Sequence, residues 1–147
     1  MGTAALIRNY RVRAGKSRQE AAEHLGLNEA WYHDLEQHDD ELTSTLTLFQ
    51  AIELASFLGV RLRDLLADGR SPAELIDLAQ LPSRITEHLA RTGMSVEQFE
   101  EEVGWELHEF MQSPLRVAAE SPMMFLQALA GCLGLDWLSI VPDEHAG

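Results

Sequence analysis

The stretch SRQEAAEHLGLN, residues 17–28, predicts two helices joined by a tight turn. Ser17 and Glu20 have the spacing of a capping box, in which each residue's side chain accepts a hydrogen bond from the other's backbone amide. Gly26 supplies the left-handed backbone conformation that ends a helix sharply, and Asn28 is a favourable N-cap for the next helix. We therefore expect one helix over 17–25 and a second from Asn28 to about Gln37.

Apolar residues keep a helical spacing on both sides of this stretch. The pattern predicts a first helix over 3–14, and a strongly apolar helix over 46–58 with a short turn at 62–66 after it. The polar and acidic residues 38–45 are typical of a loop. Because no segment alternates apolar and polar residues between hairpin turns, we expect an all-α protein.

The second half of the chain repeats the order of these signals. With an offset of 78, the residues Ile7, Arg13, Gly15, Ser17, Glu23 and Gly26 correspond to Ile85, Arg91, Gly93, Ser95, Glu101 and Gly104. Between the halves, Ser71-Pro-Ala-Glu74 combines a capping box with a proline at the first helical position. We therefore expect two domains, 1–69 and 82–147, joined by a linker helix over 70–81.

Charge is distributed unevenly along the 147 residues, which carry 11 Lys and Arg against 24 Asp and Glu, a net charge of -13. Residues 1–18 contain five basic residues and no acidic one. Residues 1–69 hold 7 basic and 11 acidic residues, whereas residues 70–147 hold 4 and 13. Non-specific affinity for nucleic acid comes from neutralising phosphates, so the charge argues against DNA binding by the second half most strongly.

The first half resembles the Cro/repressor-type helix-turn-helix family, also called XRE-type. The resemblance covers about residues 6–66, and its most specific part is Ser17-x-x-Glu20-x-Ala22-x-x-Leu25-Gly26-Leu27. Residues 82–141 match only as a divergent copy. The resemblance implies a compact five-helix bundle in which the second helix crosses the DNA backbone and the third lies in the major groove. We therefore expect two tandem five-helix repressor-like helix-turn-helix bundles joined by a short helix.

The basic segment and the resemblance together lead to expected roles for individual residues. Phosphate contacts are expected from the basic residues Arg8, Arg13, Lys16 and Arg18. Base contacts are expected from Gln19, Asn28, Glu29, Ala30 and His33. Arg11 matches the family arginine that pairs with the acidic residue ending the third helix, here Glu36, so these two are expected to form a structural ion pair.

The chain departs from the family in its third helix, the one expected to contact bases, because this helix is acidic. Residues 28–36 contain Glu29 and Asp34 but no Lys or Arg, whereas an arginine fork is the commonest reader of guanine. In the second copy, acidic residues occupy both corresponding helices, at Glu97, Glu100, Glu101, Glu102, Glu106 and Glu109. Nothing in those two helices can neutralise a phosphate.

These observations lead to two hypotheses of different class. In the first, the chain is a homodimeric transcriptional regulator that binds DNA through its N-terminal copy. The acidic C-terminal copy then serves for dimerisation or for binding a protein partner. In the second, it is an acidic protein-interaction module that keeps the fold without binding DNA. The bulky residues Trp105, Leu107, Phe110 and Met111 either form a contact for another protein or fill the core between the copies.

Other classes of function find no support in the sequence. It has no recognisable catalytic motif, so neither an enzymatic activity nor a cofactor is expected. His24, His33 and His38 lie in acidic surroundings, but their spacing does not match a zinc motif and no metal is expected. No apolar run is long enough for a membrane span and no secretory signal is recognisable, so we expect a cytoplasmic protein without membrane contact.

Overall fold

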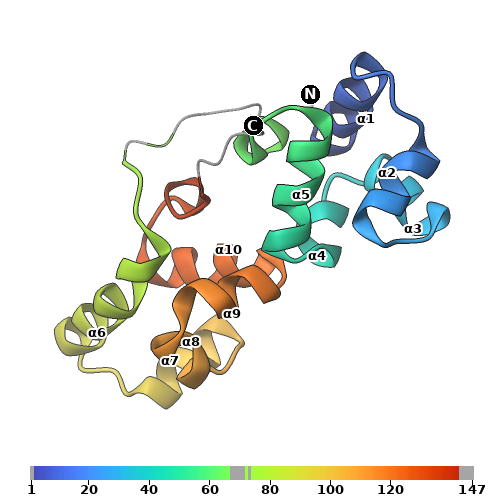
Figure 1. Cartoon of the computed structure of the whole chain (residues 1–147). Coiled ribbons are helices and arrows are strands. Elements are labelled where there is room, and N and C mark those ends of the chain that lie inside the picture. Colours follow the sequence, from blue (N-terminus) through green and yellow to red (C-terminus); the bar gives the residue numbers. More distant parts are fainter. Residues whose placement is uncertain (1, 67–71, 73, 143–147) are drawn as a thin grey trace. The chain divides into compact units, whose positions relative to one another are not determined.

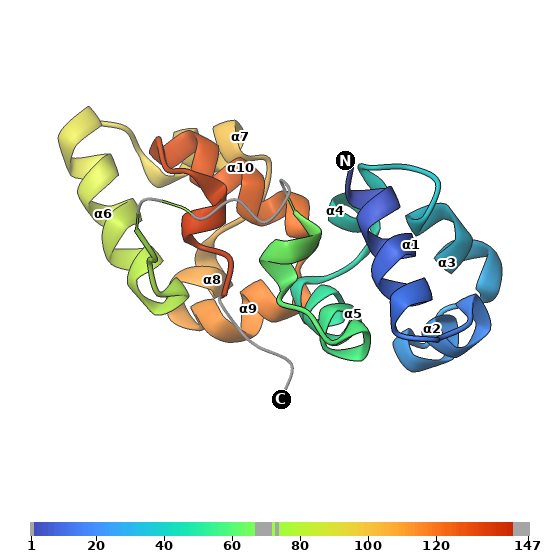
Figure 2. The ribbon, with the colours of Figure 1, turned by 90° about the horizontal axis from the view of Figure 1, so that it is seen from above.

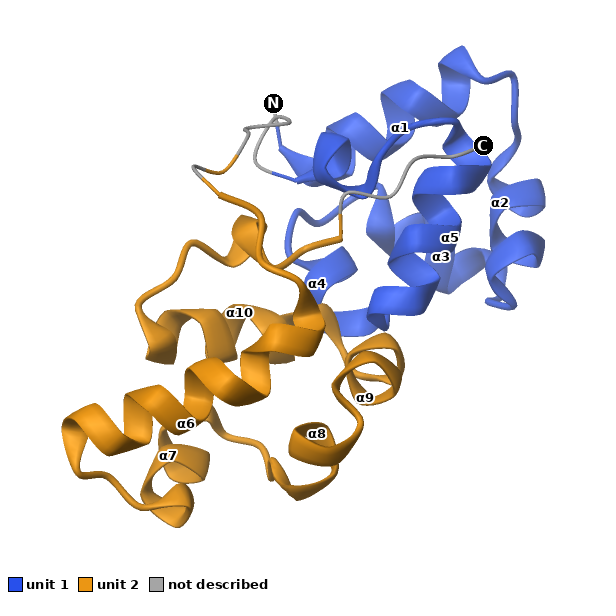
Figure 3. Cartoon of the chain, turned by 60° about the vertical axis from the view of Figure 1, so that its left-hand side comes forward, with its two compact units in different colours: residues 1–71, 143–147 blue, residues 72–142 orange. Residues whose placement is uncertain are grey.

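The computed structural model describes residues 2–66, 72 and 74–142 of the chain (Figure 1). Every regular element in these ranges is helical, with ten α-helices, three 3-10 helices and no β-strand. The prediction of an all-α protein is confirmed. The chain divides into two compact units, which Figure 3 colours separately: unit 1 comprises residues 1–71 and 143–147, and unit 2 comprises residues 72–142.

Residues 2–66, the described part of unit 1, form five α-helices and a short 3-10 helix. They are α1 (Thr3–Arg13), α2 (Arg18–Leu25), α3 (Glu29–Leu35), α4 (Glu41–Thr45), α5 (Leu48–Leu58) and η1 (Leu62–Leu65). The helices α2 and η1 pack on α5, and α3 lies side by side with α2 (Figure 2). Since α5 buries apolar residues around Ala51 and Leu54 at helical spacing, it is the centre of this core.

Unit 2 contains the same order of helices after an initial 3-10 helix. Its elements are η3 (Leu78–Gln80), α6 (Leu81–Thr92), α7 (Val96–Val103), α8 (His108–Gln112), α9 (Pro114–Glu120), α10 (Met123–Leu133) and η4 (Trp137–Ser139). Both α6 and α7 pack on α10. Ser95 caps α7 with a capping box and Gly104 ends it at a positive φ of 87°, as Ser17 and Gly26 do for α2.

An aromatic cluster lies at the centre of unit 2. The Phe125 ring meets the rings of Phe110 and Trp105 edge-on, at centroid distances of 5.4 and 5.5 Å. Leu107 and Phe110 are fully buried, while Trp105 and Met111 are half-buried. Phe110 and Trp105 therefore belong to the core of unit 2 itself.

The structure corrects the loop expected over residues 38–45, because α4 occupies Glu41–Thr45. Leu42 is fully buried, and the hydroxyl of Ser44 donates a hydrogen bond of 2.9 Å to the Asp40 carbonyl. This helix packs against both α1 and α3. A single buried leucine and these tertiary contacts stabilise a helix that the polar local sequence does not favour.

The structure also corrects the linker helix expected over 70–81. Residues 70, 71 and 73 lie outside the described residues, and residues 74–77 are not helical. The Ile76 amide instead donates a hydrogen bond of 2.7 Å to the Ser139 carbonyl, and Ile76 and Leu78 are buried. The segment is thus drawn into the core of unit 2 by contacts that are distant in sequence.

Candidate nucleic-acid interface

Local hydrogen bonds define the ends of α2 and α3. The Ser17 hydroxyl accepts from the Glu20 amide at 3.0 Å, and the Glu20 carboxylate accepts from the Ser17 amide at 2.9 Å. Gly26 ends α2 at a φ of 72°, and Asn28 Oδ1 accepts from the Trp31 amide at 2.8 Å to begin α3. The two helices are therefore connected by only the three residues 26–28.

One face of α2 and one face of α3 are buried, and most of the residues expected to contact bases lie on the exposed faces. Ala21, Ala22 and Leu25 of α2, together with Tyr32 and Leu35 of α3, are buried. The remaining faces expose the expected base contacts Gln19, Asn28, Glu29 and Ala30, while His33 is half-buried. The side-chain oxygen of Asn28, Oδ1, accepts the capping hydrogen bond, so the side-chain nitrogen, Nδ2, is the atom left to donate to a base.

A buried ion pair joins α1 to the end of α3. Arg11 donates to the Glu36 carboxylate from Nε at 2.6 Å and from Nη2 at 3.1 Å. Its Nη1 also donates to the Lys16 carbonyl at 2.8 Å, so the same side chain holds the connection between α1 and α2. The Glu36 side chain is fully buried. Arg11 and Glu36, the pair implied by the family resemblance, are in direct contact.

Arg18 lies in the same cluster. Its Nε is 3.3 Å from Glu36 Oε1, and its side chain is 36% exposed. From its place in the basic segment Arg18 was expected to contact DNA phosphates, and no local pattern linked it to Glu36, which is 18 positions away. Tyr32, four residues before Glu36, is buried and interacts with the Glu36 carboxylate, and we refer to Arg11, Arg18, Tyr32 and Glu36 as the Glu36 cluster.

Ionisation of the cluster is set by burial and by its own hydrogen bonds. Burial opposes the charged form of Glu36, but hydrogen bonding from Arg11 and the proximity of Tyr32 outweigh it, so the pKa of Glu36 lies below its usual range. Burial, with the Glu36 carboxylate beside it, raises the pKa of Tyr32. The cluster therefore contains an ionised carboxylate and a neutral phenol at neutral pH.

This shift predicts an acid-sensitive part of the stability. Because the folded-state pKa of Glu36 is depressed, its contribution is complete above the unfolded value near 4.5 and is lost as the pH falls through the folded-state pKa. The difference in free energy of unfolding between the unaltered chain and Glu36→Gln should therefore shrink as the pH falls below about 4.5. Urea denaturation of both proteins over a pH series measures it, and a constant difference would contradict the depressed pKa.

The other expected phosphate contacts occupy different environments. Arg8 and Arg13 are exposed on α1, the latter with its guanidinium carbon 5.4 Å from the Tyr10 ring centroid. Lys16 is half-buried, with Nζ 5.4 Å from the centroid of the Phe57 ring. Arg8 and Arg13 also line an open groove beside α1. Arg8 and Arg13 are thus exposed, whereas Lys16 and Arg18 are half-buried.

Trp31, for which the sequence pattern predicts no role, is 56% exposed on α3. Trp31 is four residues before the buried Leu35, a spacing that places the two side chains on neighbouring parts of the helix surface, so only the structure reveals its exposure. Glu29 and Ala30 are exposed beside it on the same helix. The accessible surface of α3 is therefore aromatic and acidic.

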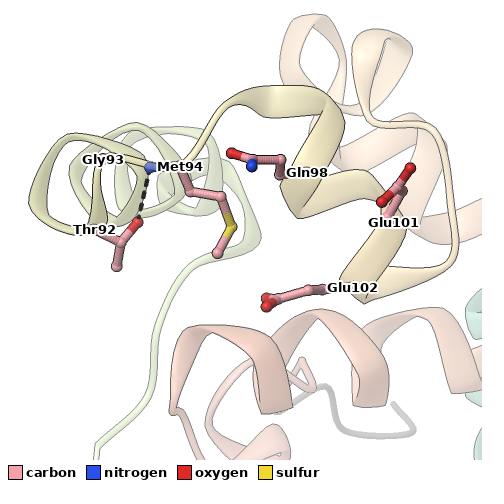
Figure 4. A pocket seen from close by; sticks show the side chains of 6 residues that line it. All are labelled: Thr92, Gly93, Met94, Gln98, Glu101 and Glu102. Atoms are coloured by element: carbon pink, nitrogen blue, oxygen red, sulfur yellow. Dashed lines mark hydrogen bonds between the residues drawn. The ribbon is translucent and has the colours of Figure 1, made fainter.

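Unit 2 is acidic at the junction of α6 and α7. A pocket where α6 meets α7 is lined by Thr92, Gly93, Met94, Gln98, Glu101 and Glu102 (Figure 4). Glu101 and Glu102 lie exposed on α7, while Glu100 accepts a hydrogen bond of 2.7 Å from the Leu107 amide. The lining contains no basic side chain, so it repels phosphate.

The described histidines of unit 1, His24, His33 and His38, belong to no group of metal-ligating side chains. His24 lies 3.5 Å from the Glu53 carboxylate and its ring centroid is 4.7 Å from that of Phe57. Across the described ranges, no three His, Cys, Asp or Glu side chains are grouped as metal ligands would be. In the same ranges, no helix has the length and apolar character needed to span a membrane.

Comparisons with protein-family models, with curated proteins and with solved structures each found no match to this chain.

Proposed function

We propose that the chain is a DNA-binding transcriptional regulator in which unit 1 is a helix-turn-helix bundle of the Cro/repressor type. In this proposal α3 enters the major groove, and Gln19, Asn28, Glu29, Ala30 and His33 are the residues available to contact bases. Arg8 and Arg13 contact phosphates. A homodimer presents two such helices to two half-sites, and unit 2 is a divergent copy of the same bundle that serves dimerisation or a protein partner.

The observation that carries the proposal is the arrangement of α2 and α3. They are joined by a turn at Gly26, and α3 is held at its end by the buried Arg11–Glu36 pair while its first residues are exposed. A short helix that is fixed by its buried face and free at its N-terminal end is what groove reading requires. The proposal concerns unit 1, because α7 and α8 carry no Lys or Arg.

The acidic residues of α3 limit the strength of this interaction. Glu29 can accept a hydrogen bond from cytosine N4, but a carboxylate near phosphates is repelled. The affinity must therefore come from Arg8 and Arg13 and from the doubling of contacts in a dimer. We expect binding that is weak at physiological salt and steeply dependent on salt concentration.

A salt titration tests this proposal directly. Random-sequence duplexes of about 30 base pairs, which accommodate two half-sites one helical turn apart, are titrated with the chain between about 50 and 200 mM salt. Affinity should fall steeply with salt. In the double variant Arg8→Ala/Arg13→Ala, the slope of log affinity against log salt should decrease by about 2 per protomer.

The matched control is Glu97→Gln, which removes an exposed charge from α7 of unit 2 and should leave the slope unchanged. Thermal melting of the double variant should also be unchanged, since both arginines are exposed. If the unaltered chain retains no duplex at the lowest salt concentration, where phosphate contacts are strongest, the DNA-binding proposal is wrong.

Trp31 favours a second candidate function, a protein-interaction module. Exposed tryptophans are enriched among the residues that dominate protein interfaces, and Glu29 and Asp34 on the same helix suit a basic partner. The two candidates predict different ligands for α3. A lysine-rich peptide that changes the fluorescence of the unaltered chain but not of Trp31→Phe would favour this module, provided duplex DNA has no such effect.

A further inference from the structure

The Glu36 carboxylate receives two arginines that come from different helices. Arg11 belongs to α1, and Arg18 is the first residue of α2. Glu36 is the C-cap residue of α3. The contact of 3.3 Å between Arg18 Nε and Glu36 Oε1 therefore ties the beginning of α2 to the end of α3, which are the outer ends of the helix pair.

Unit 2 has the same order of helices without this cluster. With the offset of 78, Arg11, Arg18 and Tyr32 correspond to Leu89, Val96 and Phe110, which are all apolar. Tyr32 and Phe110 are both fully buried and differ by one hydroxyl group. Since unit 2 forms its helices with apolar residues at these positions, the order of helices does not depend on the polar cluster.

Buried ionic groups are a costly way to gain stability. Removing charges from water opposes burial, and apolar replacements are often as stable or more stable. In unit 1 the cluster surrounds a carboxylate with no exposed surface, whereas α7 and α8 lack such a group. We therefore expect the Glu36 cluster to act on the relative orientation of α2 and α3. The hydrogen bonds between its two guanidinium groups and its carboxylate are directional.

We propose that Arg18 is a positioning residue that fixes the orientation of α3 relative to α2 through Glu36, and that it is not a phosphate contact. The proposal rests on the proposed function, in which α3 is the helix that reads bases. A phosphate that attracted Arg18 away would remove one of the donors from a fully buried carboxylate, which is unfavourable. Arg13 has no such partner acid in the cluster and serves as the exposed counterpart.

Salt dependence separates a positioning role from a phosphate contact. Two probes are used: duplexes of about 30 base pairs selected from a random pool by the unaltered chain, and the unselected pool. For Arg18→Ala we expect an unchanged salt slope and a ratio of selected to unselected affinity that falls by about fivefold or more. For the control Arg13→Ala we expect a slope reduced by about 1 and an unchanged ratio.

The conservative variant sharpens the distinction. Lysine keeps the charge but lacks the Nε donor of arginine, so Arg18→Lys should recover the selectivity only in part. If Arg18→Ala lowers the slope by about 1 and Arg18→Lys restores both slope and affinity, Arg18 is a phosphate contact and the positioning proposal is wrong.

Hydrogen exchange provides a readout that does not involve DNA. In Arg18→Ala the backbone amides of α3 should exchange about fivefold faster or more, while those of α5, the central helix of the core, keep their rates. Unchanged exchange in α3, or an equal increase in α3 and α5, would overturn the positioning role. If no duplex is bound even by the unaltered chain, the proposed function fails, and this exchange measurement still decides the role of Arg18.

Discussion

Replacing Arg11 with alanine is expected to lower the free energy of unfolding of unit 1 by about 3 kcal/mol. The variant leaves the Glu36 carboxylate, which has no exposed surface, without its closest charged partner and with the longer contact to Arg18. It also removes the donor to the Lys16 carbonyl. Urea denaturation of the full chain measures the loss. Hydrogen exchange in α1 of unit 1 and in α6 of unit 2 then shows which unit has lost stability.

Two further variants show whether the loss comes from the unpaired charge. Arg8→Ala removes an exposed arginine from the same helix and should leave unfolding unchanged. Arg11→Leu/Glu36→Leu replaces the pair by apolar side chains, as leucine already does at position 89, and should recover most of the loss. A single variant Arg11→Ala as stable as the unaltered chain would refute the structural role of the pair.

Replacing Phe125 with alanine is expected to lower the free energy of unfolding of unit 2 by about 3 to 5 kcal/mol. The ring is 1% exposed and contacts both Trp105 and Phe110 edge-on, so its removal leaves a cavity and ends two aromatic contacts. Urea denaturation followed by tryptophan fluorescence measures the loss, because Trp105 is in direct contact with the replaced ring.

Met124→Ala is the matched control for this prediction. Met124 precedes Phe125 on the same helix but is 40% exposed, so its replacement should cost about 1 kcal/mol or less. Equal effects of the two variants would show that the aromatic cluster is not the core of unit 2.

The structural roles of residues that act on their immediate neighbours could be predicted from the sequence. The capping boxes at Ser17 and Ser95 depend on hydrogen bonds three residues apart. Gly26 and Gly104 adopt the positive φ that their positions in the pattern predict. The spacing of apolar residues likewise indicated an all-α chain.

Residues that act over a distance needed the structure. Arg18 has a basic side chain in a basic segment, and only the packing of α2 beside α3 brings it to Glu36. Residues 41–45 are helical because Leu42 is buried, although their local sequence is that of a loop. Residues 74–77 are not helical because the Ile76 amide donates a hydrogen bond to the Ser139 carbonyl, and Ser139 lies near the C-terminal end of the unit 2 sequence.

The sequence by itself therefore determined the helical class, the principal helix starts and stops, and the uneven charge of the two halves, since these depend on contacts within one or two turns or on composition alone. Only the tertiary structure decided which of the basic residues are accessible. It placed Arg8 and Arg13 at the surface and drew Arg18 toward a buried carboxylate. The physical reason is that a charge is either solvated or paired according to what packs around it, and that packing is formed by residues distant in the chain.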